Sequence, residues 1–156
     1  MGIMMAVLHL MVGLPCCGKT TYAKKLSGET GALRFTPDEW QFRLFGDDVY
    51  DPYHDRRHSE IELIMWELAS SLLQKGVSVI LDYGFWGRSE RDGLRSEAKR
   101  LGAGFKIHFI DVPLEELERR LEIRNSQPGQ FNIPFSMLKD WHDNYFQRPE
   151  PSELEF

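Results

Sequence analysis

The chain has 156 residues, which is the size of one domain and enough to bury a core. Hydrophobic residues make up 42% and charged residues 28%, a composition that excludes a disordered protein. The net charge of −5 argues against a general nucleic-acid-binding protein, although a local basic groove is compatible with it. No apolar run is long enough to cross a membrane, and the N-terminus lacks the basic region and cleavage site of a signal peptide.

Strands alternate with helices along the chain. Short apolar runs predict buried strands, and apolar residues at helical spacing predict helices. We expect strands at residues 6–12, 32–35, 77–82 and 105–112, and helices at residues 18–27, 37–45, 54–75, 88–101, 114–125 and 135–147. This alternation predicts an α/β fold of three layers, with a mostly parallel sheet of about four to five strands and helices on both faces. No linker or repeat interrupts it, so we expect a single domain over residues 1–156.

The same spacing predicts which helix faces are buried. The residues expected in the core are Ile61, Ile64, Leu68 and Leu72 of the long helix and Leu138, Trp141 and Tyr145 of the last one. Thr36 precedes Pro37 and two acidic residues, so we expect it to cap the helix that follows. The tail from residue 148 is expected to be irregular.

The stretch Gly13-Leu14-Pro15-Cys16-Cys17-Gly18-Lys19-Thr20 fits the phosphate-binding pattern of Gly, four residues, Gly-Lys-Ser/Thr. It lies between an expected strand and an expected helix, which is the setting that the motif requires. The N–H groups of such a loop surround phosphates, Lys19 adds a point charge, and the Thr20 hydroxyl can bind Mg²⁺. The residues expected to bind ATP are Gly13, Leu14, Pro15, Cys16, Cys17, Gly18, Lys19, Thr20 and Thr21.

The two cysteines, Cys16 and Cys17, are neighbours inside this loop. Neighbours in sequence seldom form a structural disulfide, and no metal-ligand spacing is present. We therefore expect a reducing, cytoplasmic setting. Apart from the Mg²⁺ that accompanies the nucleotide, we expect no metal.

Three carboxylates lie at or beyond the ends of expected strands, which is the edge where parallel sheets bind ligands. They are Asp38, Asp82 and Asp111. Asp82 ends an apolar strand, where a buried charge needs a partner. We expect it to hold Mg²⁺ through water or to contact a substrate, and the capping of a turn is the alternative.

Two groups of arginines are candidates for binding anions. Arg120 and Arg124 share a helix face at four-residue spacing, where like charges repel mildly and an anion between them would favour keeping both. Arg119 is expected to pair with nearby glutamates instead. Arg88, Arg91 and Arg95 share a face of an earlier helix, and we expect only Arg91 among them to bind a substrate.

Four motifs cover most of the chain: Gly13-x-x-x-x-Gly-Lys-Thr, Thr36-Pro-Asp-Glu-x-x-x-Arg43, Leu81-Asp-Tyr-Gly-Phe-Trp-x-Arg-x-x-Arg91 and Arg119-Arg-x-x-x-Arg124-Asn. Together they resemble the P-loop kinase group often labelled "AAA family ATPase". That group is similar to the kinase domain of polynucleotide kinases, to zeta toxins and to chloramphenicol phosphotransferase. The resemblance implies a P-loop NTPase fold, in which a fifth strand usually follows the last helix. Residues 154–156 scarcely provide one.

The resemblance also implies an activity, namely transfer of the γ-phosphate of ATP to a hydroxyl group of a small molecule, with Mg²⁺. It implies that Asp38 is the general base and that Arg120 and Arg124 act from a lid at about residues 114–134. The catalytic residues are then expected to be Lys19, Asp38, Arg120 and Arg124, the acceptor-binding residues Arg43, Asp82 and Arg91, and the metal-binding residues Thr20 and Asp82. For Asp38 a purely helix-stabilising role is the alternative, and for Arg43 a solvated charge.

Two other functions stay open at this point. One is a 5′-hydroxyl polynucleotide kinase, against which the acidic balance counts mildly. The other is an ATP-binding regulator that hydrolyses ATP slowly and signals to a protein partner. No membrane partner is expected, and neither the acceptor nor the oligomeric state follows from the sequence.

Overall fold

Four parallel strands form the central sheet of the protein, and the computed structural model describes residues 5–155. The strands are β1 (Val7–Val12), β2 (Leu33–Phe35), β3 (Val79–Gly84) and β4 (Gly104–Phe109), arranged in the order β2-β3-β1-β4. β1 is central and pairs in parallel with β3 and β4, while β2 pairs with β3 at one edge. The α/β fold with a parallel sheet is confirmed, with four strands in the described residues.

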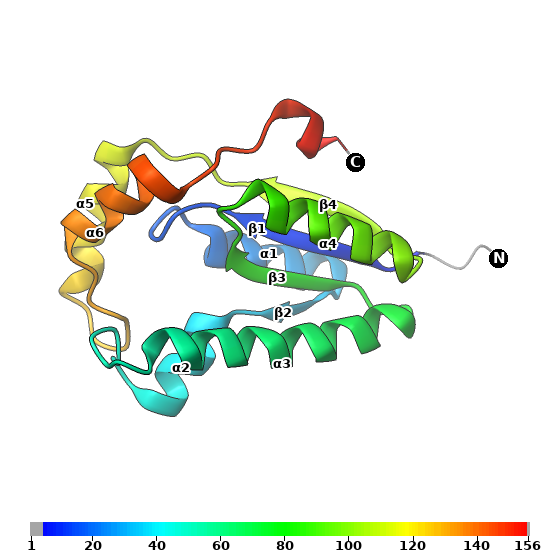
Figure 1. The fold of residues 1–156 in the computed structure, drawn as a ribbon, viewed down its shortest axis with the longest axis horizontal. Helices are drawn as coiled ribbons and strands as arrows, with labels where there is room; N and C mark the ends of the chain where they lie inside the picture. Colours follow the sequence, from blue (N-terminus) through cyan, green and yellow to red (C-terminus); the bar gives the residue numbers. More distant parts are fainter. Residues whose placement is uncertain (1–4, 156) are drawn as a thin grey trace.

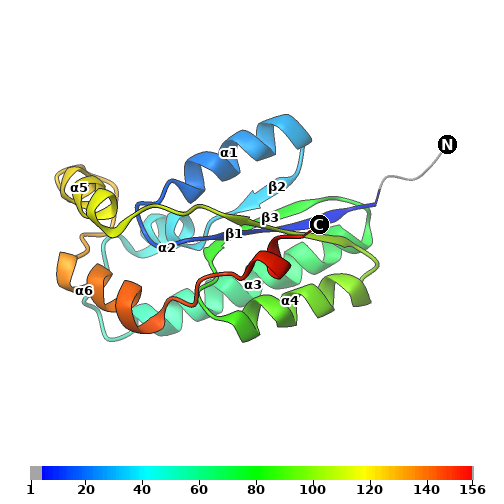
Figure 2. The same cartoon turned by 90° about the horizontal axis from the view of Figure 1, so that it is seen from above.

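Helices cover both faces of the sheet, as Figure 2 shows. α1 (Lys19–Thr30) lies on one face, and α3 (His54–Gln74) and α4 (Arg88–Arg100) lie on the other. The remaining helices gather near the carboxyl ends of the strands: α2 (Pro37–Phe45), α5 (Leu114–Asn125) and α6 (Phe135–Asp140) (Figure 1). The three layers follow from this arrangement, because each sheet face needs an apolar cover.

The core is built on the alternation of side chains along β1. Leu8, Leu10 and Val12 are fully buried among residues of α3 and α4. Met11 points to the opposite face, where it packs with Ala23 of α1. Because both faces of the strand are covered, it reads as a continuous apolar run rather than as alternating polar and apolar residues.

The buried stripe of α3 differs from the expected one. Ile61 is buried as predicted, but Ile64 and Leu68 are about half exposed. The residues that face the sheet are Ile61, Met65, Ala69 and Leu73, an exact four-residue spacing on one helix face. The helix carries apolar residues on two adjacent faces, so spacing alone did not distinguish them.

The end of the chain also differs from expectation. The last helix changes after Asp140 into one π-helical turn, Trp141–Tyr145, and Tyr145 is exposed rather than buried. The tail is not wholly irregular, because Pro151–Leu154 forms a 3₁₀ turn that packs beside β4. In Figure 1 this turn lies above β4 and α4.

Candidate functional site

The phosphate loop is held between the ends of β1 and β3. Gly13 N–H donates to the Gly84 carbonyl at 3.1 Å, and the Trp86 indole N–H donates to the Gly13 carbonyl at 3.3 Å. A Cβ on Gly13 would lie 2.6 Å from the Cys17 sulfur, so only glycine fits this approach. Cys16 has a φ of 69°, a left-handed conformation that non-glycine residues adopt mainly at turns and functional loops.

The two faces of the loop have different surroundings. Cys16 and Gly18 to Thr21 face a cavity, whereas Gly13, Leu14 and Cys17 face the start of α5 and the end of β4. Leu14 and Cys17 are buried, and burial raises the pKa of the Cys17 thiol above its usual value. The side chain of Cys17 therefore has a packing role, and the ATP contacts expected of residues 13–21 stay a prediction.

Asp82 connects two threonines beneath the loop. Its Oδ2 accepts hydrogen bonds from the hydroxyls of Thr20, at 2.6 Å, and Thr36, at 2.9 Å. Its Oδ1 is buried and has no hydrogen-bond partner in the part of the chain that the structure describes. Because the Thr20 hydroxyl donates its proton to Asp82, the lone pairs of the Thr20 oxygen are free to bind a cation. The Thr20 hydroxyl oxygen and the Asp82 carboxylate together fit Mg²⁺, which prefers hydroxyl, carboxylate and water oxygens.

A cavity of about 620 Å³ lies between the phosphate loop, α2 and the segment from α5 to residue 131. This volume is within the range of small-molecule sites. The charged side chains that line it are Lys19, Lys24, Asp38, Glu39, Arg43, Arg120 and Arg124. Positive charges outnumber negative ones here, although the whole chain is acidic. The cavity is therefore suited to an anion-bearing ligand.

Asp38 and Arg43 come from α2 and reach this cavity. The Asp38 side chain is 52% exposed, so it is open to a ligand. Thr36 stands at the N-cap position of α2, but its hydroxyl binds Asp82 instead of capping the helix. Thr36 is the N-cap residue of α2 as predicted, but its hydroxyl oxygen makes no cap hydrogen bond, because it accepts from the Arg34 guanidinium at 2.6 Å instead.

Arg120 and Arg124 lie on α5 and both reach the phosphate loop. The Arg120 guanidinium donates to the carbonyls of Cys16 and Cys17, at 3.2 Å each. An Arg124 guanidinium nitrogen lies 3.7 Å from the Cys16 sulfur, and its buried Nε has no hydrogen-bond partner among residues 5–155. The expected convergence of these two arginines on the loop is therefore present in the geometry.

Arg119 pairs with Glu116 and points away from the cavity. The hydrogen bonds from Arg119 and Arg120 lower the pKa of Glu116 to about 2. Arg119 therefore has the surface role expected for it, and Glu116 holds Arg120 in place from the outer side of α5.

Arg91 does not lie in the cavity. Its side chain is 1% exposed, and its guanidinium donates to Glu153 at 2.8 Å and to the Phe85 carbonyl at 2.9 Å. The predicted contact with an acceptor is therefore corrected, because the buried guanidinium binds Glu153 of the C-terminal turn and the Phe85 carbonyl. Asp111 also lies outside the cavity, where it pairs with Arg148.

The segment after α5 reaches across to the α2 side of the cavity. Phe131 packs edge-on against Phe42 and His54, and the Asn132 N–H donates to Asp47 at 3.3 Å. In Figure 1 the chain between α5 and α6 descends toward the loop that joins α2 to α3. The predicted lid region thus closes one side of the cavity. Phe131 is not predicted from the sequence as a site residue, because its partners are distant in the chain.

No helix within residues 5–155 combines the length and apolar character needed to cross a membrane. A family model described as an AAA domain matches residues 8–149. No curated protein matches the chain in sequence.

Several solved structures share the fold. A chain of the Pnkp1/Rnl/Hen1 RNA repair complex is 26% identical, with a TM-score of 0.70, over 87% of this chain and 42% of that one. The present chain thus spans less than half of that relative. A sugar kinase from a Janibacter species is 22% identical, with a TM-score of 0.66, over 98% of this chain and 84% of its own. Kti12 of Chaetomium thermophilum, in complex with ADP-AlF3, is 21% identical, with a TM-score of 0.70, over 93% and 82% of the two chains.

Proposed function

Because the chain belongs to the AAA-domain family over residues 8–149, with kinases among its structural neighbours, we propose that it transfers the γ-phosphate of ATP to a hydroxyl group of a small molecule. One observation carries the proposal. The phosphate loop, the Asp38 carboxylate, Arg43 and the arginines of α5 all open into one cavity. A mere nucleotide-binding site would not require an exposed carboxylate on the far wall.

The phosphate loop would bind the triphosphate of ATP. Backbone N–H groups at the start of α1 and the Lys19 ammonium face the cavity and supply positive charge. Thr20 and Asp82 would hold Mg²⁺, whose charge neutralises the phosphates as they react. Asp82 also fixes the Thr20 hydroxyl, so that its oxygen is oriented before the ligand arrives.

Asp38 would accept the proton of the acceptor hydroxyl. The proton moves to a carboxylate oxygen of Asp38 as the hydroxyl oxygen bonds to the γ-phosphorus and the bond to the leaving ADP oxygen breaks. Arg43, on the same helix, would bind a negative group of the acceptor. Arg120 and Arg124 would stabilise the charge on the transferred phosphoryl group, with the Arg120 position set by Glu116.

A 5′-hydroxyl polynucleotide kinase is the second candidate. The 26% identical neighbour comes from an RNA repair complex, and the cavity carries an excess of positive charge that suits a phosphodiester. A regulator that only hydrolyses ATP is the third candidate, and the carboxylate exposed in the cavity counts against it.

The test is an incubation with γ-labelled ATP, Mg²⁺ and a panel of acceptors: aminoglycosides, nucleosides, sugar nucleotides, sugars and 5′-hydroxyl oligonucleotides. We expect label on one class of acceptor in wild type and no transfer in Asp38→Asn, with ATP binding retained. Asp111→Asn is the matched control, since Asp111 lies outside the cavity, and it should remain active. Label released only as inorganic phosphate, whatever acceptor is present, would contradict the kinase and favour the regulator.

A further inference from the structure

Thr36 is the N-cap residue of α2 and lies beside the Thr20 and Asp82 oxygens that fit Mg²⁺. Its hydroxyl donates to Asp82 Oδ2 at 2.9 Å, and the Thr20 hydroxyl donates to the same oxygen at 2.6 Å. We propose that Thr36 is a positioning residue of the metal site, which it serves by holding the Asp82 carboxylate in one orientation. This inference rests on the proposed function, because that function places Mg²⁺ on Thr20 and Asp82.

The register of the sheet brings Thr36 and Asp82 together. Phe35 of β2 pairs with Leu81 of β3, and Thr36 keeps the extended backbone of β2, with φ of −120° and ψ of 100°. The next residues along the two parallel strands, Thr36 and Asp82, are therefore neighbours. Phe35 and Leu81 belong to the core cluster on the α3 and α4 side of the sheet. Because side chains alternate along a strand, Thr36 and Asp82 point to the other face, where Thr20 lies in α1.

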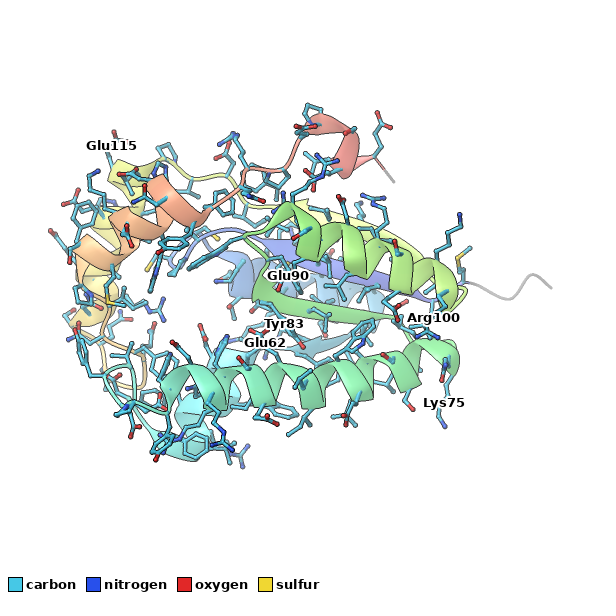
Figure 3. All side chains as sticks on the ribbon, viewed as in Figure 1. Glu62, Lys75, Tyr83, Glu90, Arg100 and Glu115 are labelled. Atoms are coloured by element: carbon cyan, nitrogen blue, oxygen red, sulfur yellow. The ribbon has the colours of Figure 1, made fainter. Side chains whose placement is uncertain are left out.

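Tyr83, which follows Asp82 in β3, points away from α1. Figure 3 shows Tyr83 on the α3 side of β3, near Glu62, and the Tyr83 hydroxyl donates to the Glu62 carbonyl at 3.1 Å. Asp82 is only 3% exposed on the opposite side of the strand. Its carboxylate therefore depends on protein groups or on a ligand for its hydrogen bonds, since bulk water does not reach it.

Arg34 fixes the direction of the hydrogen bond between Thr36 and Asp82. The Arg34 Nη1 lies 2.6 Å from Thr36 Oγ1 and 3.0 Å from Glu39 Oε2. A guanidinium has no acceptor atom, so the Thr36 oxygen accepts from Arg34, and the single Thr36 proton needs an acceptor elsewhere. Thr36 is buried, and the acceptor that the described residues provide for its proton is Asp82. The hydroxyl of Thr36 is thus committed to Asp82.

Two donors on one oxygen leave the other oxygen of Asp82 for the metal site. Oδ2 accepts from Thr20 and Thr36, whereas Oδ1 is buried and has no hydrogen-bond partner within residues 5–155. A buried oxygen of this kind is costly unless a ligand completes it. Water carried by Mg²⁺ can supply the missing hydrogen bond, because Mg²⁺ keeps several of its waters when it is bound. Without the Thr36 hydroxyl, one hydrogen bond alone holds Oδ2, and the carboxylate is free to turn.

Metal binding to the full chain tests the proposal without any acceptor. The protein is loaded with a non-hydrolysable ATP analogue, and Mn²⁺, a paramagnetic substitute for Mg²⁺, is titrated into the complex and followed by electron paramagnetic resonance. Thr36→Val keeps the branched shape of the side chain and removes the hydroxyl. We expect it to raise the Kd for Mn²⁺ by about three- to tenfold, the effect of one lost hydrogen bond. Thr36→Ser retains the hydroxyl and should bind Mn²⁺ as wild type does.

Two controls separate a role in the metal site from a general structural role. In EDTA, the metal-free ATP analogue should bind equally well to wild type and to Thr36→Val, because the phosphate loop is intact in both. Thr30→Val is the matched control. The Thr30 hydroxyl also donates, to the Leu26 carbonyl at 2.7 Å, and accepts, from the Ala32 N–H at 3.2 Å, but it lies outside the cavity. This variant should leave the Kd for Mn²⁺ unchanged.

Four results would overturn the proposal. They are no binding of Mn²⁺ to the wild-type complex, an unchanged Kd for Mn²⁺ in Thr36→Val, an equal loss of metal-free binding in that variant, and a Thr36→Ser variant as weak as Thr36→Val. If Thr36→Val does not fold, Thr36→Ala removes the same hydroxyl without placing a methyl group against Asp82, and the same outcomes decide.

The metal titration and the transfer assay fail separately. An absence of transfer to every acceptor of the panel would refute the proposed function, while the Kd for Mn²⁺ would still decide the role of Thr36. With an acceptor that the panel identifies, we expect Thr36→Val to need more Mg²⁺ for its half-maximal rate and to approach the wild-type rate at saturating Mg²⁺. A deficit that no Mg²⁺ concentration relieves would contradict a role through the metal.

Discussion

The buried ion pair between Arg91 and Glu153 allows a sharp stability prediction. The two side chains are 1% and 2% exposed, and Glu153 accepts from Arg91 Nε at 2.8 Å. Glu153→Ala leaves the guanidinium buried with the Phe85 carbonyl as its main acceptor. Removing one partner of a buried pair costs about 3–5 kcal/mol, a large part of the roughly 5–15 kcal/mol that stabilises a typical domain.

Urea unfolding followed by circular dichroism measures this loss. The double variant Arg91→Met with Glu153→Leu removes both charges together, so it should recover most of the stability lost in Glu153→Ala. Glu155→Ala, an exposed neighbour, should change the free energy of unfolding by less than about 0.5 kcal/mol. A loss below about 1 kcal/mol in Glu153→Ala, or a double variant as unstable as the single one, would refute the argument.

The pH dependence gives an independent check on the same pair. Burial acts to raise the pKa of Glu153, but hydrogen bonds from Arg91 and from the Glu150 backbone, with the charges of Arg91 and Arg88, hold it below the usual value. The unfolded chain therefore binds the proton first as the pH falls. The contribution of Glu153 is present above its unfolded pKa and is lost as the pH falls through its folded pKa. The stability difference between wild type and Glu153→Ala should narrow in acid, and a constant difference would contradict the pairing.

Two further predictions concern the site itself. Arg124→Ala should lower turnover at least tenfold in the labelled transfer assay, which corresponds to about 1.4 kcal/mol of transition-state stabilisation. Arg119→Ala is the control, because Arg119 pairs with Glu116, and this variant should keep its turnover. Equal activity of the two variants would remove Arg124 from the mechanism. Gly13→Ala should destabilise the protein by about 1–3 kcal/mol in thermal unfolding, because the new Cβ would meet the Cys17 sulfur. Gly28→Ala in α1 is the control, because a Cβ there has open space around it, and this variant should be more stable than wild type. A Gly13 variant as stable as wild type would show that the loop relaxes around the new Cβ.

The parts of the structure that the sequence predicts are those determined by residues close together in the chain. The phosphate loop is a local pattern with a strand before it and a helix after it, so its conformation and position followed from the sequence. The order of strands and helices followed for the same reason, since apolar runs and breaks are local. The convergence of Asp38 and Arg124 on one cavity followed more indirectly, through motifs shared with a group of kinases.

The parts that escaped prediction depend on partners distant in the chain. Arg91 was taken for a ligand-binding residue because nothing near it in sequence shows that Glu153 covers it. The hydroxyl of Thr36, predicted only as a helix cap, donates to Asp82 on another strand, a contact that the neighbours of Thr36 in sequence do not indicate.

The contact of Phe131 with Phe42 and His54 has a consequence for how ligands enter and leave. The cavity wall runs from the phosphate loop through α5 and residue 131 to α2. Along this wall α5 is anchored by the buried Leu117 and Leu121. Phe131 is buried in the same apolar cluster, and Phe42 of α2 packs against it. Separating residue 131 from α2 would therefore expose aromatic surface to water, so widening the cavity on this side costs free energy.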